Sequence, residues 1–276
     1  MKIAAWLAAI LVLVPCPANA QGTSASSPAA PLAIGETFTI QSAALGETRR
    51  INVYAPPAYV ATKDARLPVL YMPDGGMAED FLHIAGLVQV LTGNGTMRPF
   101  LLVGIENTQR RRDLSGPTQN AEDRKIAPVV GGSAAFRQFI KSELMPVITN
   151  RYRTTGETAI MGESLAGLFV VETLYLDPAM FDTYIAFDPS LWWNNNAMVT
   201  GAAGRVTAGW TKPKRLYIAS SGEKQLAPLA KELADILAAQ APVNLTWHYE
   251  LLAAETHATI YHPAALQALR RLFAPK

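Results

Sequence analysis

Apolar and polar residues follow two different periodicities along this chain, one typical of strands and the other of helices. Two stretches near the start, 36–45 and 48–54, alternate every second residue around Leu45-Gly46-Glu47, which favours an antiparallel hairpin. Beyond them, runs of consecutive apolar residues are separated by longer segments with helical spacing. We predict strands over 68–72, 100–105, 158–161, 181–187, 215–220 and 243–252, and helices over 78–91, 134–150, 165–176, 225–239 and 263–273.

Strands of continuous apolar residues joined by helices are typical of an α/β fold with a mostly parallel central sheet flanked by helices on both faces. Half of the 276 residues are hydrophobic, enough for a large core, and we predict one domain over 36–276. Ligands of such sheets bind beyond the carboxyl ends of the strands. We therefore expect the functional residues directly after strands.

The first twenty residues have the pattern of a secretory signal peptide. Lys2 precedes an apolar run over 3–14, and Ala18-Asn19-Ala20 supplies small residues for cleavage before Gln21. The run is too short to span a bilayer, so we expect no stable membrane anchor. The chain's single cysteine, Cys16, lies inside this segment, which predicts a mature chain without disulfides or a thiol nucleophile. We expect a disordered leader over 21–35 and a periplasmic or secreted protein.

Charge excludes some classes of partner. The chain has 24 basic and 22 acidic residues, for a formal net charge of +2. Nucleic-acid binding and membrane-surface binding need a concentrated basic excess, and only the short run Arg110-Arg111-Arg112 resembles one. Small molecules are therefore the expected partners, and the sequence leaves the oligomeric state open.

The most informative stretch is 158–167, in which an apolar run leads through Gly162-Glu163-Ser164 into a helical pattern. A tight turn from strand to helix exposes a serine hydroxyl at the edge of the sheet, where a base can activate it. Such a turn needs small residues on both sides. Gly162 fits, whereas Ala166 stands where the strict G-x-S-x-G pattern has glycine, with Gly167 following. We predict Ser164 as a nucleophile.

The base should follow the serine in the chain. His83 precedes it and His248 lies within a predicted strand, which favours structural roles for both. His257 comes in a loop directly after the last strand, where a base is expected, while His262 begins the last helix. We predict His257 as the base.

Two carboxylates compete for the role of orienting the imidazole. Glu223 follows the strand 215–220 across a Ser221-Gly222 turn, and Asp188 ends the preceding strand. Glu223 is the prediction and Asp188 the alternative. Glu232 and Asp235 lie three residues apart on a helix, as expected of a solvated face.

An oxyanion needs two N–H donors, one after the nucleophile and one after the third strand. Leu165 fits the first role, and the glycines of 71–76 the second. The long segment 107–132 follows a strand and should overhang the same edge, so Arg112 is a candidate to bind substrate or to pair with a local carboxylate. Trp192 and Trp193 are candidates to line an aromatic pocket or to belong to the core.

With these residues in place, the chain resembles the putative esterase family of α/β hydrolases from about Glu36 onward. The similarity lies in 70–75, 104–108 with 112–114, 143–167 and 189–193, and it is greatest to the branch with trilactone siderophore esterases. The resemblance implies a triad of Ser164, Glu223 and His257, oxyanion donors at Leu165 and Gly76, and no metal or organic cofactor. Pro73 and Asp188 stand where members often have Leu and Ser.

The resulting hypothesis is a serine carboxylic ester hydrolase that works through an acyl-enzyme on siderophore or aryl esters. The same triad would also serve an acyltransferase if water were excluded. A non-catalytic ligand-binding relative is the third alternative, although a binding site has no need of a serine, a histidine and a carboxylate together.

Overall fold

A computed structural model describes residues 27–206 and 210–275 of the protein. The chain divides into the units 1–33 and 34–276. Residues 27–33 of the first unit are exposed and have neither helix nor strand. The predicted signal peptide 1–20, with Cys16, lies outside the described residues. No helix in the described ranges is long and apolar enough to span a membrane.

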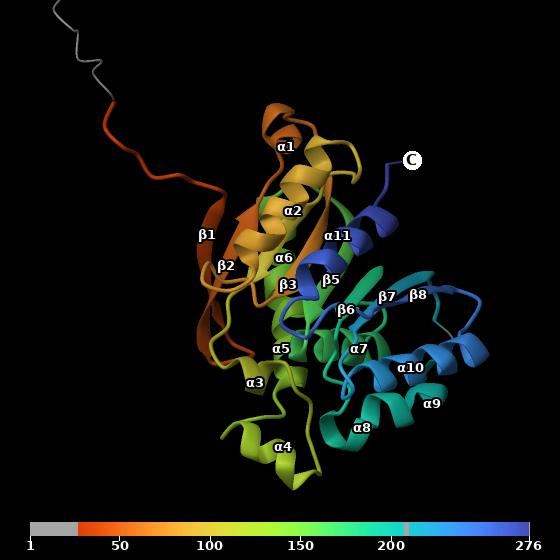
Figure 1. Ribbon diagram of the computed structural model, residues 1–276. Coiled ribbons are helices and arrows are strands. Elements are labelled where there is room, and N and C mark those ends of the chain that lie inside the picture. The colour runs from red at the N-terminus through yellow and green to blue at the C-terminus, as the bar shows by residue number, and fades with distance from the viewer. Residues whose placement is uncertain (1–26, 207–209, 276) are drawn as a thin grey trace, which may run out of the picture. The chain divides into compact units, whose positions relative to one another are not determined.

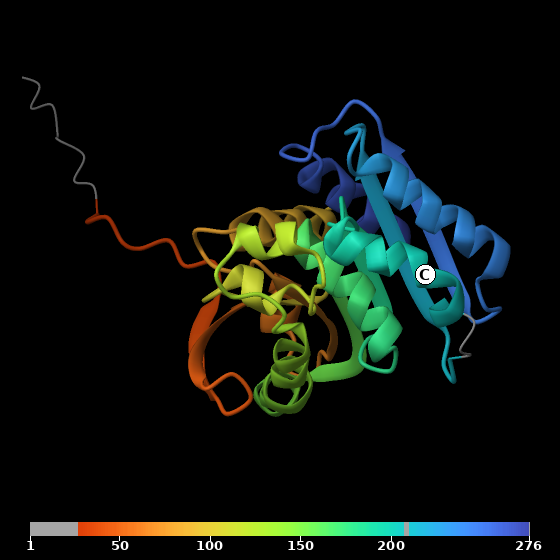
Figure 2. The same cartoon turned by 90° about the horizontal axis from the view of Figure 1, so that it is seen from below.

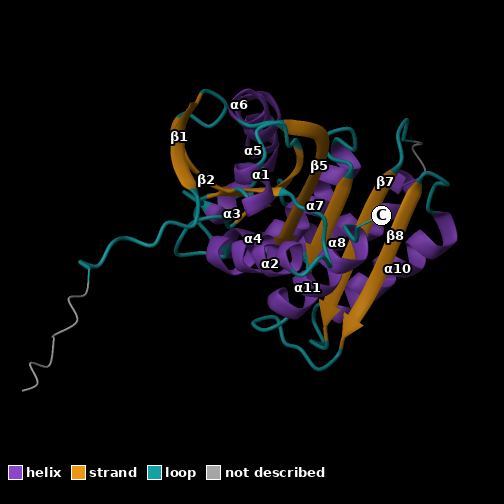
Figure 3. Ribbon diagram, turned by 90° about the horizontal axis from the view of Figure 1, so that it is seen from above, coloured by secondary structure: helices purple, strands orange, loops and turns teal. Residues whose placement is uncertain are grey.

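The described strands of the second unit form one eight-stranded sheet, whose strands β7 and β8 appear as long, neighbouring arrows in Figure 3. Its order is β1-β2-β4-β3-β5-β6-β7-β8, with β1 and β2 antiparallel to their neighbours and the other strands parallel to one another. The strands are β1 (Glu36–Ser42), β2 (Glu47–Tyr54), β3 (Leu67–Pro73), β4 (Leu101–Ile105), β5 (Thr154–Glu163), β6 (Thr183–Phe187), β7 (Lys214–Ser221) and β8 (Leu245–Leu252).

Helices cover both faces of the sheet (Figures 1 and 2). The pair α2 and α11 packs on one face, and the segment α5 to α6 with α7 and α10 packs on the other. The described helices are α1 (Pro57–Ala61), α2 (Phe81–Gly93), α3 (Arg110–Asp113), α4 (Ala121–Ile126), α5 (Ser133–Phe139), the π-helical η1 (Ile140–Leu144), α6 (Met145–Arg151), α7 (Leu165–Leu176), α8 (Trp193–Thr200), α9 (Ala202–Val206), α10 (Ala227–Gln240) and α11 (Tyr261–Leu272).

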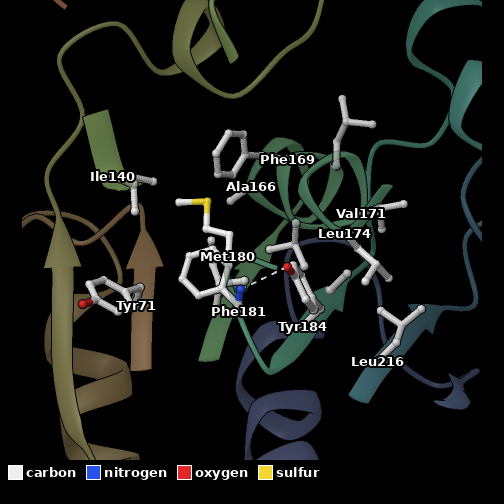
Figure 4. Packing of buried hydrophobic residues seen from close by; sticks show 14 of the residues in the cluster. Tyr71, Ile140, Ala166, Phe169, Val171, Leu174, Met180, Phe181, Tyr184 and Leu216 are labelled. Atoms are coloured by element: carbon white, nitrogen blue, oxygen red, sulfur yellow. Dashed lines mark hydrogen bonds between the residues drawn. The ribbon is translucent and has the colours of Figure 1, made fainter. Parts of the chain in front are cut away.

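Successive residues of the central strands point into two separate cores. On β3, Val69 and Tyr71 face the larger core, whereas Leu70 and Met72 face the core under α2 and α11. Figure 4 shows Tyr71 in the larger core beside the Phe181 ring, which in turn packs against the Tyr184 ring of β6. Both strand faces are thus buried, which is why these strands read as continuous apolar runs.

The predicted α/β architecture is confirmed, including the hairpin and the alternation of strands with long helices. The pattern did not predict the short helices α1, α3, α4, α8 and α9. The predicted helix 134–150 contains the π-helical turn η1 just before Pro146. Pro146 has no N–H for the carbonyl four residues earlier, and a widened turn accommodates this missing bond.

Candidate active site

Ser164 lies between the end of β5 and the start of α7, in the backbone conformation of a sharp elbow. Its φ and ψ are 61° and −120°, a region that residues with a side chain rarely adopt. A Cβ at Gly162 would lie 2.6 Å from the Cβ of Ala166, and one at Gly167 would lie 3.0 Å from the carbonyl oxygen of Phe187. Close approach therefore requires glycine at 162, whereas a side chain at 167 would make a tight contact with the backbone, and the methyl of Ala166 fits because Gly162 faces it.

Backbone hydrogen bonds fix this elbow against the end of β6. The N–H of Ser164 donates to the carbonyl of Phe187 at 3.0 Å, and the N–H of Ser190 donates to the carbonyl of Ser164 at 3.0 Å. The hydroxyls of Ser164 and Ser190 lie 3.4 Å apart. Ser190 is a neighbour of the predicted nucleophile that the sequence patterns did not single out.

The structure brings His257 to Ser164. The imidazole reaches the elbow from the loop between β8 and α11, and its Nε2 lies 3.0 Å from the Ser164 Oγ. This loop packs on the segment after β7, where the N–H of Gly222 donates to the carbonyl of Glu255 at 3.1 Å. His83 and His262 instead stack on each other between α2 and α11, with ring centroids 4.9 Å apart.

The carboxylate at the imidazole differs from the one predicted. Glu223 accepts a hydrogen bond from the backbone N–H of His257 at 2.8 Å, so it holds the loop rather than the ring. Asp188, the alternative, has its Oδ2 3.1 Å from the Nδ1 of His257. Glu223 was expected at the ring because the end of β7 lies at the correct edge. In the structure, Glu223 lies at this edge but contacts the backbone of His257 instead of its ring.

Asp188 is held rigidly for this contact. Its side chain is fully buried, its φ is 39°, and its Oδ1 accepts a hydrogen bond from the N–H of Ser221 at 2.7 Å. Its own N–H donates to the carbonyl of Ala219 at 2.8 Å. Because β6 and β7 are parallel neighbours, the end of one strand can orient a side chain that follows the other. Asp188 thus connects the sheet to the His257 ring.

A second carboxylate lies at the same ring nitrogen. The Oε1 of Glu163, the residue directly before Ser164, is 3.2 Å from the Nδ1 of His257. Burial raises the pKa of this carboxyl group from 4.5 to about 7. The pKa of His257 is also raised, chiefly by the hydrogen bond to Asp188. The sequence pattern gave no signal for Glu163, because this residue stands at the unspecified position of the G-x-S elbow.

Hydrogen bonds to the side chains of Arg110 and Glu79 hold the loop after β3 in place. Asp74, at a φ of 56°, accepts two hydrogen bonds from Arg110, at 2.7 and 2.8 Å. The N–H of Gly76, a predicted oxyanion donor, donates to the Oε2 of Glu79 at 2.7 Å and is occupied in this structure. Leu165 is the first residue of α7, and its N–H is one of those that lack a partner within the helix. Its oxyanion role stays a prediction.

The other residues predicted to contact a substrate make contacts with other parts of the protein. Arg112 pairs with Glu47 at 2.7 Å and with Asp113 at 2.6 Å, which is the alternative named for it. Trp193 is buried and its Nε1 donates to the carbonyl of Gly116 at 2.9 Å, so it fastens the long segment after β4. Trp192 is partly buried beside it, with ring centroids 5.9 Å apart.

The site therefore combines a hydroxyl, an imidazole and two carboxylates, all at the carboxyl ends of strands. Such a set can move a proton from the hydroxyl to the imidazole and support the charge that forms on the ring. Within residues 27–206 and 210–275, no group of three or more His, Cys, Asp or Glu side chains is arranged to hold a metal ion.

Comparison with known proteins shows to which family this chain belongs. The family model described as "Putative esterase" matches residues 42–219, which is more than half of the chain. The chain belongs to this esterase family. The family's serine hydrolase chemistry agrees with the elbow at Ser164, and the resemblance seen in the sequence is confirmed.

Several members with siderophore-related names are similar to this esterase. It is 27% identical over 248 residues to the ferri-bacillibactin esterase BesA of Bacillus subtilis, an alignment that covers 81% of this chain and 85% of that protein. It is 30% identical over 178 residues to the siderophore triacetylfusarinine C esterase of Aspergillus fumigatus, covering 60% of this chain and 59% of the relative.

A solved structure is also similar, that of an IroE-like serine hydrolase from Shewanella oneidensis. It has 30% identity and a TM-score of 0.79 over 87% of this chain and 80% of the other. The structure of the siderophore hydrolase EstB from Aspergillus nidulans, at 20% identity, has a TM-score of 0.73 over 91% of this chain and 98% of that one. At that identity the second likeness shows the fold alone.

Proposed function

We propose that this esterase hydrolyses ester bonds of siderophores through an acyl-enzyme. The observation that carries the proposal is the 3.0 Å approach of the His257 Nε2 to the Ser164 Oγ, with a buried carboxylate 3.1 Å from the opposite ring nitrogen. The names of the relatives support siderophore esters as the substrate class.

In the proposed mechanism, Ser164 attacks the ester carbonyl while His257 takes its proton at Nε2. Asp188 accepts the Nδ1–H, which fixes the tautomer and stabilises the imidazolium. The alcohol leaves with a proton from Nε2, and a water molecule activated by the same nitrogen then releases the acid. The N–H of Leu165 is assigned to the oxyanion. Gly76 can join it only in a state in which Glu79 has released its N–H.

We further propose that the protein is exported, as the sequence of residues 1–20 suggests. An exported esterase would meet siderophores outside the cytoplasm. Fractionation of the source cells tests this directly, and recovery of the protein with an intact N-terminus in the cytoplasm would contradict it.

Activity is best tested with a graded set of esters: 4-nitrophenyl butyrate, methyl ferulate, an iron-free trilactone siderophore and its ferric complex. We expect Ser164→Ala to reduce kcat by a factor of about 10⁴ or more. Ser142→Ala, at an exposed serine on η1, is the matched control and should retain the wild-type rate. A fluorophosphonate probe should label the wild type and the control but not Ser164→Ala.

Three results bear on the alternatives. Turnover of the trilactone at a kcat/KM well above that of the aryl esters supports the siderophore assignment, and the reverse order contradicts it. Transfer of the acyl group to an added alcohol, in preference to water, would identify an acyltransferase. Folded protein that neither reacts with the probe nor cleaves any ester would overturn the esterase mechanism and favour a binding role.

A further inference from the structure

The imidazole of His257 has carboxylates on two sides of one nitrogen. Its Nδ1 lies 3.1 Å from Asp188 and 3.2 Å from Glu163. A neutral imidazole whose Nε2 accepts the serine proton carries a single N–H, at Nδ1. Only one of the two acids can fully accept that N–H at a time. An ordinary triad has one acid at this place.

The two contacts differ in kind. The Asp188 contact has the geometry of a hydrogen bond, whereas the Glu163 Oε1 approaches within ion-pair distance without a hydrogen bond of its own. Glu163 has little exposure, with 16% of its side chain accessible. A buried oxygen without a hydrogen-bond donor is costly, so its position beside an imidazole that becomes charged during turnover needs an explanation.

We propose that Glu163 is a second acid for His257, a positioning residue that supports the imidazolium together with Asp188 and takes over the Nδ1–H when Asp188 is removed. The inference rests on the proposed function. No bond to Glu163 forms or breaks in it: the proton passes from the Ser164 Oγ to Nε2 and on to the leaving alcohol, and Glu163 contributes only its charge and an acceptor for the Nδ1–H.

The surrounding charges set when Glu163 can act. His257 and Arg110 favour its ionised form, whereas Asp188 and Asp74 oppose it, and burial is the largest influence. Its pKa is about 7. Glu163 therefore changes charge near neutral pH, and its support of the imidazolium should increase as the pH rises through that value.

A double-mutant cycle measures this shared role through kcat/KM for 4-nitrophenyl butyrate. In enzymes with a single acid, its replacement by the amide costs a factor of about 10⁴ in kcat. We expect Asp188→Asn to cost a factor of only about 10 to 100 here, because Glu163 remains. Glu163→Gln alone should cost about two- to fivefold, but about 100-fold when added to Asp188→Asn.

Glu223→Gln is the matched control, because Glu223 contacts the main chain of His257 rather than the ring. Its effect should be the same factor in the wild-type and Asp188→Asn backgrounds. The acid limb of Asp188→Asn should also contain the ionisation of Glu163, at a pKa below its wild-type value because Asp188 no longer opposes the ionised form, and the added Glu163→Gln should remove that contribution. A merely structural role for Glu163 would not move this pH profile.

The outcomes separate the two proposals. Wild-type protein that is inactive and unlabelled by the fluorophosphonate probe overturns the esterase mechanism itself. An active wild type in which Glu163→Gln has the same effect in both backgrounds overturns the role of Glu163. If the variants fail to fold, ¹⁵N NMR titration of the wild-type His257 ring decides. Two ionisations sensed at Nδ1 support the inference, and a single one contradicts it.

Discussion

Replacement of Arg49 by methionine tests how the segment after β4 is held against the sheet. Arg49 lies on β2 with no exposed side-chain surface, and it forms an ion pair with the equally buried Asp113. Its guanidinium also donates to the Oε1 of Glu47 at 3.0 Å, to the hydroxyl of Thr108 at 2.9 Å and to the carbonyl of Glu106 at 2.8 Å. One side chain thus connects the edge hairpin to the segment that carries Arg110 and Arg112.

The contacts fix the size of the expected effect. Breaking a buried ion pair costs about 3 to 5 kcal/mol, because the remaining charge loses its partner. Asp113 keeps Arg112, whose Nε lies 2.6 Å away, and methionine retains the packing on the Phe136 ring. We therefore expect a loss near the lower end, about 3 kcal/mol in the free energy of unfolding. For a domain of this size, that loss lowers Tm by roughly 6 to 12 °C.

Urea unfolding followed by tryptophan fluorescence measures this loss. Arg270→Met, at an exposed position on α11, is the control and should change the free energy of unfolding by less than about 0.5 kcal/mol. Adding Asp113→Leu to Arg49→Met should restore part of the stability, because the buried carboxylate is then removed as well. A loss below about 1 kcal/mol for Arg49→Met, with an unchanged m-value, would refute the view that this cluster anchors the segment.

Because the pKa of His257 is raised and the base must be neutral, the acid limb of kcat/KM should lie above pH 6.5 and move down in Asp188→Asn; a limb at or below 6.5 in the wild type would contradict this. The folded state binds the Glu163 proton more tightly than the unfolded state does. The protonated Glu163 therefore stabilises the fold fully below pH 4.5, and this stabilisation is lost as the pH rises to about 7. That change is worth about 3 kcal/mol in urea titrations and should be absent in Glu163→Gln. Gly75→Ala would place a Cβ 2.3 Å from the Cα of Gly104, and calorimetry should show a loss of more than about 2 kcal/mol, whereas a Tm within 2 °C of the wild type would contradict this packing.

Local patterns were sufficient to predict the order of strands and helices in this fold and the two residues, Ser164 and His257, of the proposed catalytic pair. The apolar runs of β3 to β7 are continuous because both faces are buried, and the glycine at 162 is fixed by close approach. Ser164 and His257 follow strands whose carboxyl ends meet at one edge, so their proximity follows from topology. These features depend on the order of strands and helices, which the pattern of apolar and polar residues indicates directly.

The remaining features depend on contacts between segments distant in sequence. From the sequence, Arg112 was a candidate to bind either a substrate or a local carboxylate. Only the structure shows that Glu47, which is distant in the sequence, lies beside it. The Gly76 N–H could have been free, but Glu79 lies three residues further along the turn and reaches back to it. Trp193 donates to a carbonyl of the long segment, a partner that the sequence pattern did not indicate. Periodicity carries no information about such pairings.

The choice between Asp188 and Glu223 illustrates the same limit at the centre of the site. Both residues follow strands that end at the catalytic edge, and both contact His257, one through the ring and the other through the main chain. Glu223 lies beyond a turn, where its longer side chain reaches the backbone of the loop. Asp188 is buried directly at the end of β6, where the N–H of Ser221 fixes one oxygen and leaves the other to face the ring. The two carboxylates thus restrain the histidine at two points, and this restraint lowers the entropy that the loop would lose on reaching the serine. In the proposed mechanism Asp188 therefore acts on the ring, and Glu223 holds the loop that carries the histidine.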